Sequence, residues 1–241
     1  MLLTFNSATA TKTAPQNRHD DFEVQINPPL NLGPNAKAAL VKYNGYYSWH
    51  NITSESDNHR VRYSSDNGLT FQDIVFENGL YSYEDLNKYL EFAVKPALPP
   101  SFKFQETTYK VKITVPENCI LDLRTSNFAQ LLGYLPIVLV AGEYTSPNPP
   151  NLSQDLDTLF IHCDFIKDSI VDGSWGNILH SFTTANLVPG YPFSQEPRNL
   201  MYLPTSSQTI SRARIYLTDV YKRPVCLNAA PVTIVISIKD D

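Results

Sequence analysis

The chain has 241 residues and a net charge of −5, and its hydrophobic content of 42% is enough for a folded core. Because phosphate binding needs clustered Lys and Arg, this charge balance counts against a protein that binds nucleic acid specifically. The 14 Tyr, 12 Phe and 18 Pro, against only 9 Gly, are typical of a sheet protein that uses proline to end its strands.

Cysteine usage and apolar runs suggest where the protein works. Cys119, Cys163 and Cys226 have no metal-binding spacing, and their odd number favours reduced thiols over a disulfide framework. The apolar run at the N-terminus is too short for a signal peptide, and no run reaches the roughly 18 apolar residues of a membrane span. We therefore expect a protein that is neither secreted nor membrane-spanning, in which the sequons at Asn51 and Asn151 are chance matches.

Residues 1–21 are predicted to form a flexible N-terminal arm. From Asn6 to Asp21 the segment is rich in Ala, Thr, Asn and Gln and has no periodicity, so it cannot bury enough surface to fold alone. Two interpretations stay open, a disordered terminus and a segment that orders only against a neighbouring subunit. In both, the folded domain begins at Phe22.

Alternating apolar residues predict strands from there onward. The first combines Phe22, Val24 and Ile26 and should end at Pro28, since proline cannot donate to a strand ladder. Further strands are predicted over residues 38–43, 60–63, 69–71, 110–115, 156–166, 178–182, 212–217 and 232–238.

The segment 156–166 carries the longest uninterrupted strand pattern in the chain. Its two faces alternate strictly, as in a half-buried antiparallel strand. One face is Leu159, Ile161, Cys163 and Phe165, and the other is Phe160, His162 and Asp164.

Two short helices are predicted among the strands. Ser82 is an N-cap followed three residues later by Asp85, and apolar residues recur at helical spacing until Pro96. A shorter helix is predicted over residues 127–132, with Gly133 as its left-handed stop.

About eight to ten strands without βαβ alternation or internal repeats favour an all-β fold, an antiparallel sandwich with one or two short inserted helices. The Pro-, Asn- and Ser-rich stretch 144–154 could link two small domains. Neither half has enough strands to close its own sandwich, so we expect one domain over residues 22–241.

No catalytic, metal-binding or cofactor-binding site is predicted, and we do not expect an enzyme. The common nucleophile, nucleotide and zinc motifs do not occur. His19 lies in the predicted arm, and His162 and Cys163 are strand neighbours that point to opposite faces. A cupin-like metal site assembled in space is the alternative, from His50, His59 and His180.

Aromatic residues are the candidates for a binding surface. Tyr46, Tyr47 and Trp49 lie close together in the sequence, and Trp175 lies in a turn-rich loop. Such residues are common in cores, at subunit interfaces and at sugar-stacking platforms. We predict that these four contribute to a subunit interface.

Five segments occur in the order seen in a known family. They are Gly79-Leu-Tyr-Ser-Tyr-Glu-Asp-Leu-Asn-Lys-Tyr89, Phe128-Ala-Gln-Leu-Leu-Gly-Tyr134, Val188-Pro-Gly-Tyr191, Asn199-Leu-Met-Tyr-Leu-Pro204 and Arg214-Ile-Tyr-Leu-Thr-Asp219. In order and spacing they resemble the penton, or minor capsid, proteins of adintoviruses and the related Maverick/Polinton elements. The resemblance covers most of the chain from about Phe22.

The resemblance implies a single jelly roll that forms a homopentamer at capsid vertices beside a double jelly-roll major capsid protein. The protein would then belong to the virion capsid and be assembled inside the host cell, in the nucleus or the cytoplasm. A glycan- or receptor-binding jelly-roll module is the alternative, with Tyr47, Trp49 or Trp175 as stacking surfaces.

Overall fold

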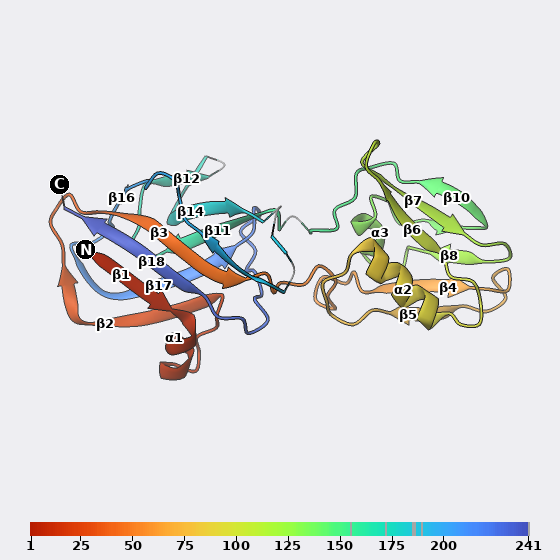
Figure 1. The fold of residues 1–241 in the computed structure, drawn as a ribbon, viewed down its shortest axis with the longest axis horizontal. Helices are drawn as coiled ribbons and strands as arrows, with labels where there is room; N and C mark the ends of the chain where they lie inside the picture. Colours follow the sequence, from red (N-terminus) through yellow and green to blue (C-terminus); the bar gives the residue numbers. More distant parts are fainter. Residues whose placement is uncertain (155, 172, 185–186, 189, 241) are drawn as a thin grey trace. The chain divides into compact units, whose positions relative to one another are not determined.

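The computed structural model describes residues 1–241 except 155, 172, 185, 186, 189 and 241. The chain folds into two compact units, which Figure 1 shows. Met1–Trp49 and Asp155–Asp241 form the first, which we call the jelly-roll unit, and His50–Gln154 forms the second, the inserted unit. This division differs from the prediction of one domain over residues 22–241.

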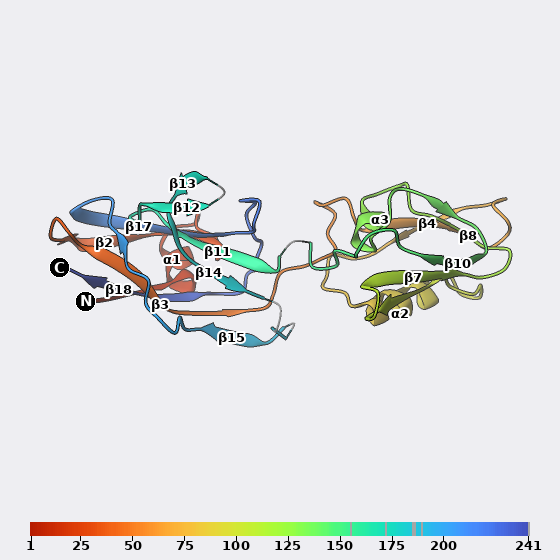
Figure 2. The same ribbon diagram turned by 90° about the horizontal axis from the view of Figure 1, so that it is seen from above.

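The jelly-roll unit is a sandwich of two antiparallel sheets, seen as two layers in Figure 2. One sheet has the order β1-β18-β3-β15, with β16 also pairing with β3, and the other has the order β14-β11-β17-β2. Along the chain, most successive strands switch between the sheets, while β11 and β14 are neighbours in the same sheet. This is the Greek-key connectivity of a jelly roll. The predicted all-β sandwich is confirmed. The strands are β1 (Leu2–Asn6), β2 (Asp21–Asn31), β3 (Lys37–Tyr46), β11 (Thr158–Cys163), β14 (Ile178–Thr183), β15 (Pro192–Gln195), β16 (Leu203–Pro204), β17 (Thr209–Thr218) and β18 (Thr233–Lys239).

Strand alternation builds the core between these sheets. Leu159, Ile161 and Cys163 of β11 are buried and lie in the same apolar cluster as Ile215 of β17 and Ile236 of β18. The inner face predicted for residues 156–166 is therefore confirmed. Burial on this face raises the pKa of the Cys163 thiol, as expected for a thiol surrounded by apolar side chains.

The prediction of a flexible arm over residues 1–21 is wrong. β1 pairs with β18 from Leu2 to Asn6, and Phe5 is buried in the core. Asn6 then caps α1 (Ser7–Thr13), since its side-chain oxygen accepts hydrogen bonds from the N–H groups of Ala8 (2.9 Å) and Thr9 (3.2 Å). A five-residue strand followed by a seven-residue helix is too short to give a clear period in sequence.

The inserted unit has a core of its own between two small sheets. Their orders are β10-β7-β6 and β5-β4-β8-β9. The number of strands predicted for this segment is small for an independent domain, but three- and four-stranded sheets with two helices suffice. The elements are β4 (Arg60–Ser64), β5 (Gln72–Val75), α2 (Tyr83–Ala93), β6 (Ser101–Gln105), β7 (Lys110–Val115), β8 (Ile120–Asp122), α3 (Phe128–Leu131), β9 (Val138–Leu139) and β10 (Gly142–Thr145).

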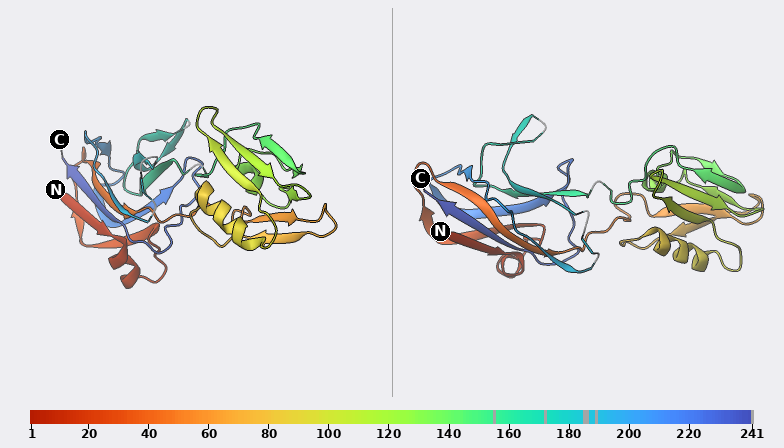
Figure 3. Two further views of the ribbon diagram at one scale, coloured as in Figure 1. Left: turned by 45° about the vertical axis from the view of Figure 1, so that its right-hand side comes forward. Right: turned by 45° about the horizontal axis from the view of Figure 1, so that its top comes forward.

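Both predicted helices are present in the inserted unit, and Figure 3 shows α2 on the outside of this unit. The Ser82 hydroxyl accepts from the Asp85 N–H at 3.1 Å, and the Asp85 carboxylate accepts from the Ser82 N–H at 3.1 Å, which completes the capping box. Leu86 and Leu90 bury the apolar side of α2. Of the helices in the described residues, none is long and apolar enough to cross a membrane.

His162 lies on the outer face of β11 yet is buried by a stacked cluster. Its ring is parallel to that of Tyr216, with 4.4 Å between centroids. The Asn177 Oδ1 accepts a hydrogen bond from the Tyr216 hydroxyl (3.1 Å) and lies 3.0 Å from the His162 Nδ1, so we assign the ring proton to Nδ1. The Nε2 is then free to accept from the Thr218 hydroxyl at 2.9 Å. This network holds the neutral ring.

This burial predicts that acid destabilises the jelly-roll unit. Desolvation lowers the pKa of His162, and the charge of Lys222 lowers it further, although the hydrogen bond with Asn177 opposes the shift. The unfolded chain therefore takes up the proton first as the pH falls below about 6.5, and stability decreases toward the folded-state pKa. Urea midpoints at pH 7.5 and 5.5 should differ less in His162→Gln than in the parent. An equal pH dependence in both proteins would contradict the assignment.

Candidate functional site

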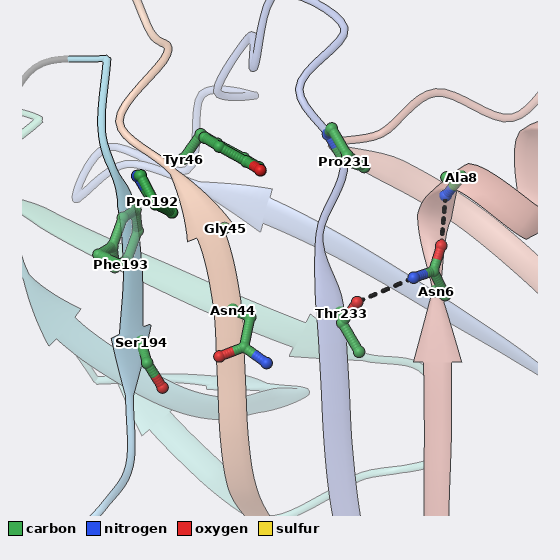
Figure 4. A pocket seen from close by; sticks show the side chains of 10 residues that line it. All are labelled: Asn6, Ala8, Asn44, Gly45, Tyr46, Pro192, Phe193, Ser194, Pro231 and Thr233. Atoms are coloured by element: carbon green, nitrogen blue, oxygen red, sulfur yellow. Dashed lines mark hydrogen bonds between the residues drawn. The ribbon is translucent and has the colours of Figure 1, made fainter.

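A groove of about 520 Å³ lies on the jelly-roll unit where two strands of one sheet diverge (Figure 4). β3 pairs with β18 as far as Asn44 and Thr233, and the chain before β18 then separates from β3 at Pro231. On its other side β3 continues to pair with β15, where Tyr46 lies opposite Pro192. The groove therefore opens between the end of β3 and the segment that leads into β18.

A row of amide and hydroxyl side chains crosses four neighbouring strands at this groove (Figure 4). The strand registers place Ser194 opposite Asn44, Asn44 opposite Thr233, and Thr233 opposite Asn6. Asn6 is held in place, because its Nδ2 donates to the Thr233 hydroxyl at 2.9 Å while its Oδ1 caps α1. The Asn44 amide has no hydrogen-bond partner among the described residues and is available to a ligand or a partner protein.

Apolar side chains frame this polar row. Tyr46 is 41% exposed and stands at the rim with Pro192 and Pro231, while Phe193 contributes from β15. None of the described residues that line the groove is charged. An uncharged lining of this kind fits an uncharged protein surface or a neutral polar ligand better than a phosphate or a carboxylate.

Gly45 lets β3 pass closely over a buried tyrosine. A Cβ at Gly45 would lie 2.7 Å from the Tyr43 hydroxyl oxygen, so no other residue fits there without moving the ring. The Tyr43 ring packs against Phe182 and Phe193, with centroid distances of 5.1 and 5.5 Å. Its hydroxyl has no hydrogen-bond partner in the described part of the chain, and burial raises its pKa.

Because that hydroxyl is desolvated without compensation, Tyr43→Phe should increase the free energy of unfolding by about 1–3 kcal/mol. Urea unfolding followed by Trp fluorescence measures this change, since both Trp residues belong to the jelly-roll unit. Tyr216→Phe is the matched control in the same unit. It removes a hydroxyl that donates to Asn177 and should reduce stability by about 0.5–1.5 kcal/mol. Destabilisation by Tyr43→Phe would show that the hydroxyl has a partner.

The predicted aromatic residues are only partly brought together. Tyr46 lines the groove, but Trp49 is 2% exposed and belongs to the core. Tyr47 stacks on Trp49, with 4.3 Å between centroids, and is half-buried. Trp49 in turn packs against Phe193 in a T-shaped arrangement, with 6.2 Å between centroids. Tyr47 and Trp49 therefore support the Tyr46 segment from beneath.

Trp175 lies on a separate hairpin and does not line the groove. The hairpin consists of β12 (Ser169–Val171) and β13 (Ser174–Gly176) and pairs Trp175 with Ile170. Trp175 is 72% exposed and Ile170 is 58% exposed. Two large apolar side chains at one hairpin make it a second candidate contact surface.

Polar side chains of the groove were not found by sequence reasoning. Asn6 fell in the predicted arm, and Asn44, Ser194 and Thr233 are ordinary outward-facing strand residues. They meet only because of strand register, for which a single sequence carries little signal.

Neither a metal cluster nor a disulfide occurs among the described residues. No group of three or more His, Cys, Asp or Glu side chains converges there, and all three cysteines are free. His162 is engaged by Asn177 and Thr218, and the His19 Nδ1 lies 2.9 Å from the Ser7 hydroxyl. These contacts account for both histidines structurally.

Comparison with known proteins provides an informative structural similarity. No family model matches the sequence, and no curated protein matches it. Among solved structures, that of the selenomethionine-labelled mavirus penton protein covers 99% of this chain and 98% of its own chain, with a TM-score of 0.53 and 11% sequence identity. At this identity the similarity establishes a shared fold, which extends over both units. It agrees with the penton resemblance found in the sequence at the level of fold.

Proposed function

We propose that the protein is a structural capsid protein, the penton subunit at the vertices of an icosahedral DNA virus or virus-like transposon. The observation that carries this proposal is the near-complete structural alignment with a penton protein, because it includes the inserted unit as well as the jelly roll. A jelly roll alone would be weak support, since that architecture serves many functions.

The proposal includes the finer features that the sequence resemblance implies. The subunit forms a homopentamer beside a double jelly-roll major capsid protein, in a virion assembled within the host cell. Its relatives are the penton proteins of adintoviruses and Maverick/Polinton elements. Its role is structural, without catalysis and without a cofactor.

We further propose that the groove at Tyr46 contributes to the contact between subunits. A closed ring uses two different surfaces of each subunit, so a surface on one copy must be complementary to a different surface on the next. The groove is uncharged and carries an exposed tyrosine, a residue type enriched at interfaces. The Asn44 amide would gain a hydrogen-bond partner there.

Light scattering of the purified protein tests assembly, and imaging of particles tests the vertex position. Tyr46→Asp places a charge in the groove and should reduce the pentamer fraction strongly. Tyr221→Asp is the matched control, because Tyr221 is 65% exposed in the same unit and lies outside the groove. A monomeric parent protein that is also absent from particle vertices would refute the penton proposal, whereas equal effects of the two variants would refute only the role of the groove.

The three described thiols are free and no described acidic cluster is present, so the contacts between subunits should be apolar and hydrogen-bonded. We expect the oligomer to survive a reducing agent and a chelator. Dissociation by the chelator alone would indicate calcium held between carboxylates of two chains.

An attachment function is the second candidate, favoured by the exposed pair Trp175 and Ile170. A glycan array with the parent protein and Trp175→Ala tests it. Binding that is lost in the variant while assembly is retained would support attachment.

A further inference from the structure

β1 forms one edge of its sheet and leaves part of its backbone unpaired. Met1, just before β1, exchanges two hydrogen bonds with Ile238, from the Met1 amine to the Ile238 C=O and from the Ile238 N–H to the Met1 C=O, each 2.8 Å. Bonded pairs alternate along an antiparallel ladder, so Leu3 and Phe5 also bond to β18. The N–H and C=O groups of Leu2 and Thr4 consequently point away from the sheet. These groups have no hydrogen-bond partner among the residues that the structure describes.

Among the described residues, side-chain amides cap single positions on two other strand edges. The Asn17 amide bonds to both backbone groups of Glu23 in β2, donating to its C=O (2.9 Å) and accepting from its N–H (3.0 Å). Asn87 of α2 does the same for Phe102 in β6, at 2.8 and 2.7 Å. An amide in this position pairs with the backbone N–H and C=O of the edge residue, as a neighbouring strand would. It therefore hinders the addition of another strand at that residue. No side-chain amide of the described residues caps the free edge of β1 in this way.

A groove of about 450 Å³ runs beside this open edge. Residues of β1, α1 and β2 line it; Figures 1 and 3 show where these three elements lie in the jelly-roll unit. Thr4 lines it together with three apolar residues, the buried Phe5 and Ala10 and the partly buried Val24. Glu23 is the one charged residue of the described lining, and its carboxylate pairs with Arg212 at 3.4 Å.

We propose that the β1 edge and this groove bind an extended, uncharged peptide segment of another protein as an additional strand. Donors and acceptors that alternate at strand spacing are matched by an extended backbone, which is the chemistry of β-strand addition. The apolar surface would take small apolar side chains at alternate positions of the segment. Glu23 is already paired with Arg212, so the groove offers no free charge to a charged segment. The inference is independent of the proposed function, since it requires neither a pentamer nor a capsid.

Thr4→Pro tests the proposal at one backbone group. The N–H of Thr4 is not used by β18, and proline is tolerated at an edge strand when its nitrogen faces outward. Thr4→Val is the matched control, since it changes the side chain and keeps the N–H. Thr9→Arg is a second blocking variant that fills the groove from α1 and leaves β1 unchanged. Circular dichroism and urea midpoints establish that each variant is folded.

The probe is a library of phage-displayed random dodecapeptides selected against the full chain, from which an enriched peptide is synthesised. We expect this peptide to bind Thr4→Pro about tenfold more weakly than the parent, because one backbone hydrogen bond is lost. Thr4→Val should bind like the parent, and hydrogen exchange should slow over residues 2–6 when the peptide binds. If Thr4→Pro proves unfolded, the deciding measurement is the affinity of the peptide for Thr9→Arg, which should be lower than for the parent.

Three results would overturn the proposal. One is a selection that enriches no peptide, and another is a peptide that binds the parent and the blocking variants equally. The third is self-association of the parent that Thr4→Pro abolishes, because a second copy of the chain would then occupy the edge. Loss of peptide binding in a variant that still assembles would leave the proposed capsid function unaffected.

Discussion

Gly133→Ala should destabilise the inserted unit by roughly 2–5 kcal/mol, the sum of two separate costs. Gly133 ends α3 with a φ of +76°, a conformation that an alanine adopts only with strain. Its new Cβ would also lie 2.2 Å from the Asn148 carbonyl oxygen and 2.9 Å from that of Pro149. The backbone cannot move away easily, because the Gly133 N–H donates to Gln130 and its C=O accepts from the Asn148 N–H.

Gly68→Ala separates these two costs within the same unit. Gly68 has a φ of +87°. The atom nearest to the new Cβ of an alanine there is the end of the Ile120 side chain at 3.0 Å, which can rotate away. Only the conformational cost of about 1–2 kcal/mol should then remain. Both Trp residues lie outside the inserted unit, so hydrogen exchange of peptides from residues 50–154 is the suitable measurement. Equal acceleration of exchange in both variants would show that the carbonyl contacts at Gly133 do not matter.

Local signals in the sequence predicted the elements that local chemistry determines. Ser82 and Asp85 fix the start of α2 through their own hydrogen bonds, and Gly133 fixes the end of α3 through its own dihedral angle. The strand at residues 156–166 was predicted because alternation over that length is incompatible with a helix. These features need no information from distant segments.

Division into two units was not predictable in the same way. The strand patterns of residues 50–154 resemble those of the jelly-roll unit. The sequence of a single strand does not indicate which sheet it will join. The decisive observation is the closure of a separate apolar cluster around Phe128 and Leu86, which is a property of packing. Strand number was therefore a poor criterion for domain number.

The candidate groove shows the same limit at the level of single side chains. Tyr46 was selected from the sequence as a tyrosine in an aromatic segment, and it lines the groove. Asn6 and Thr233 are 227 positions apart in sequence and share a hydrogen bond, which only the pairing of β1 with β18 explains. Trp49 lies three residues from Tyr46 and was selected by the same criterion, yet its side chain is buried.

Trp49→Ala should reduce the free energy of unfolding by about 3–5 kcal/mol, as expected when a buried indole is removed and leaves a cavity. The side chain is 2% exposed, stacks on Tyr47 and forms a T-shaped pair with Phe193, so its loss removes packing from the aromatic cluster next to the end of β3. A loss of ligand binding in this variant would therefore report unfolding near the groove. It would not identify Trp49 as a contact residue.

Trp175→Ala is the matched control, because it removes the only other indole of the chain from a position that is 72% exposed. Its effect on stability should stay within about 0.5 kcal/mol. Far-UV circular dichroism in urea is the appropriate measurement, since each variant lacks one of the two fluorophores. In fluorescence, the emission of Trp175→Ala should come from the buried Trp49 and shift to longer wavelength only on unfolding. Trp49→Ala should show exposed emission already in the folded state. Similar losses of stability in the two variants would contradict the core position of Trp49 and restore it as a candidate surface residue.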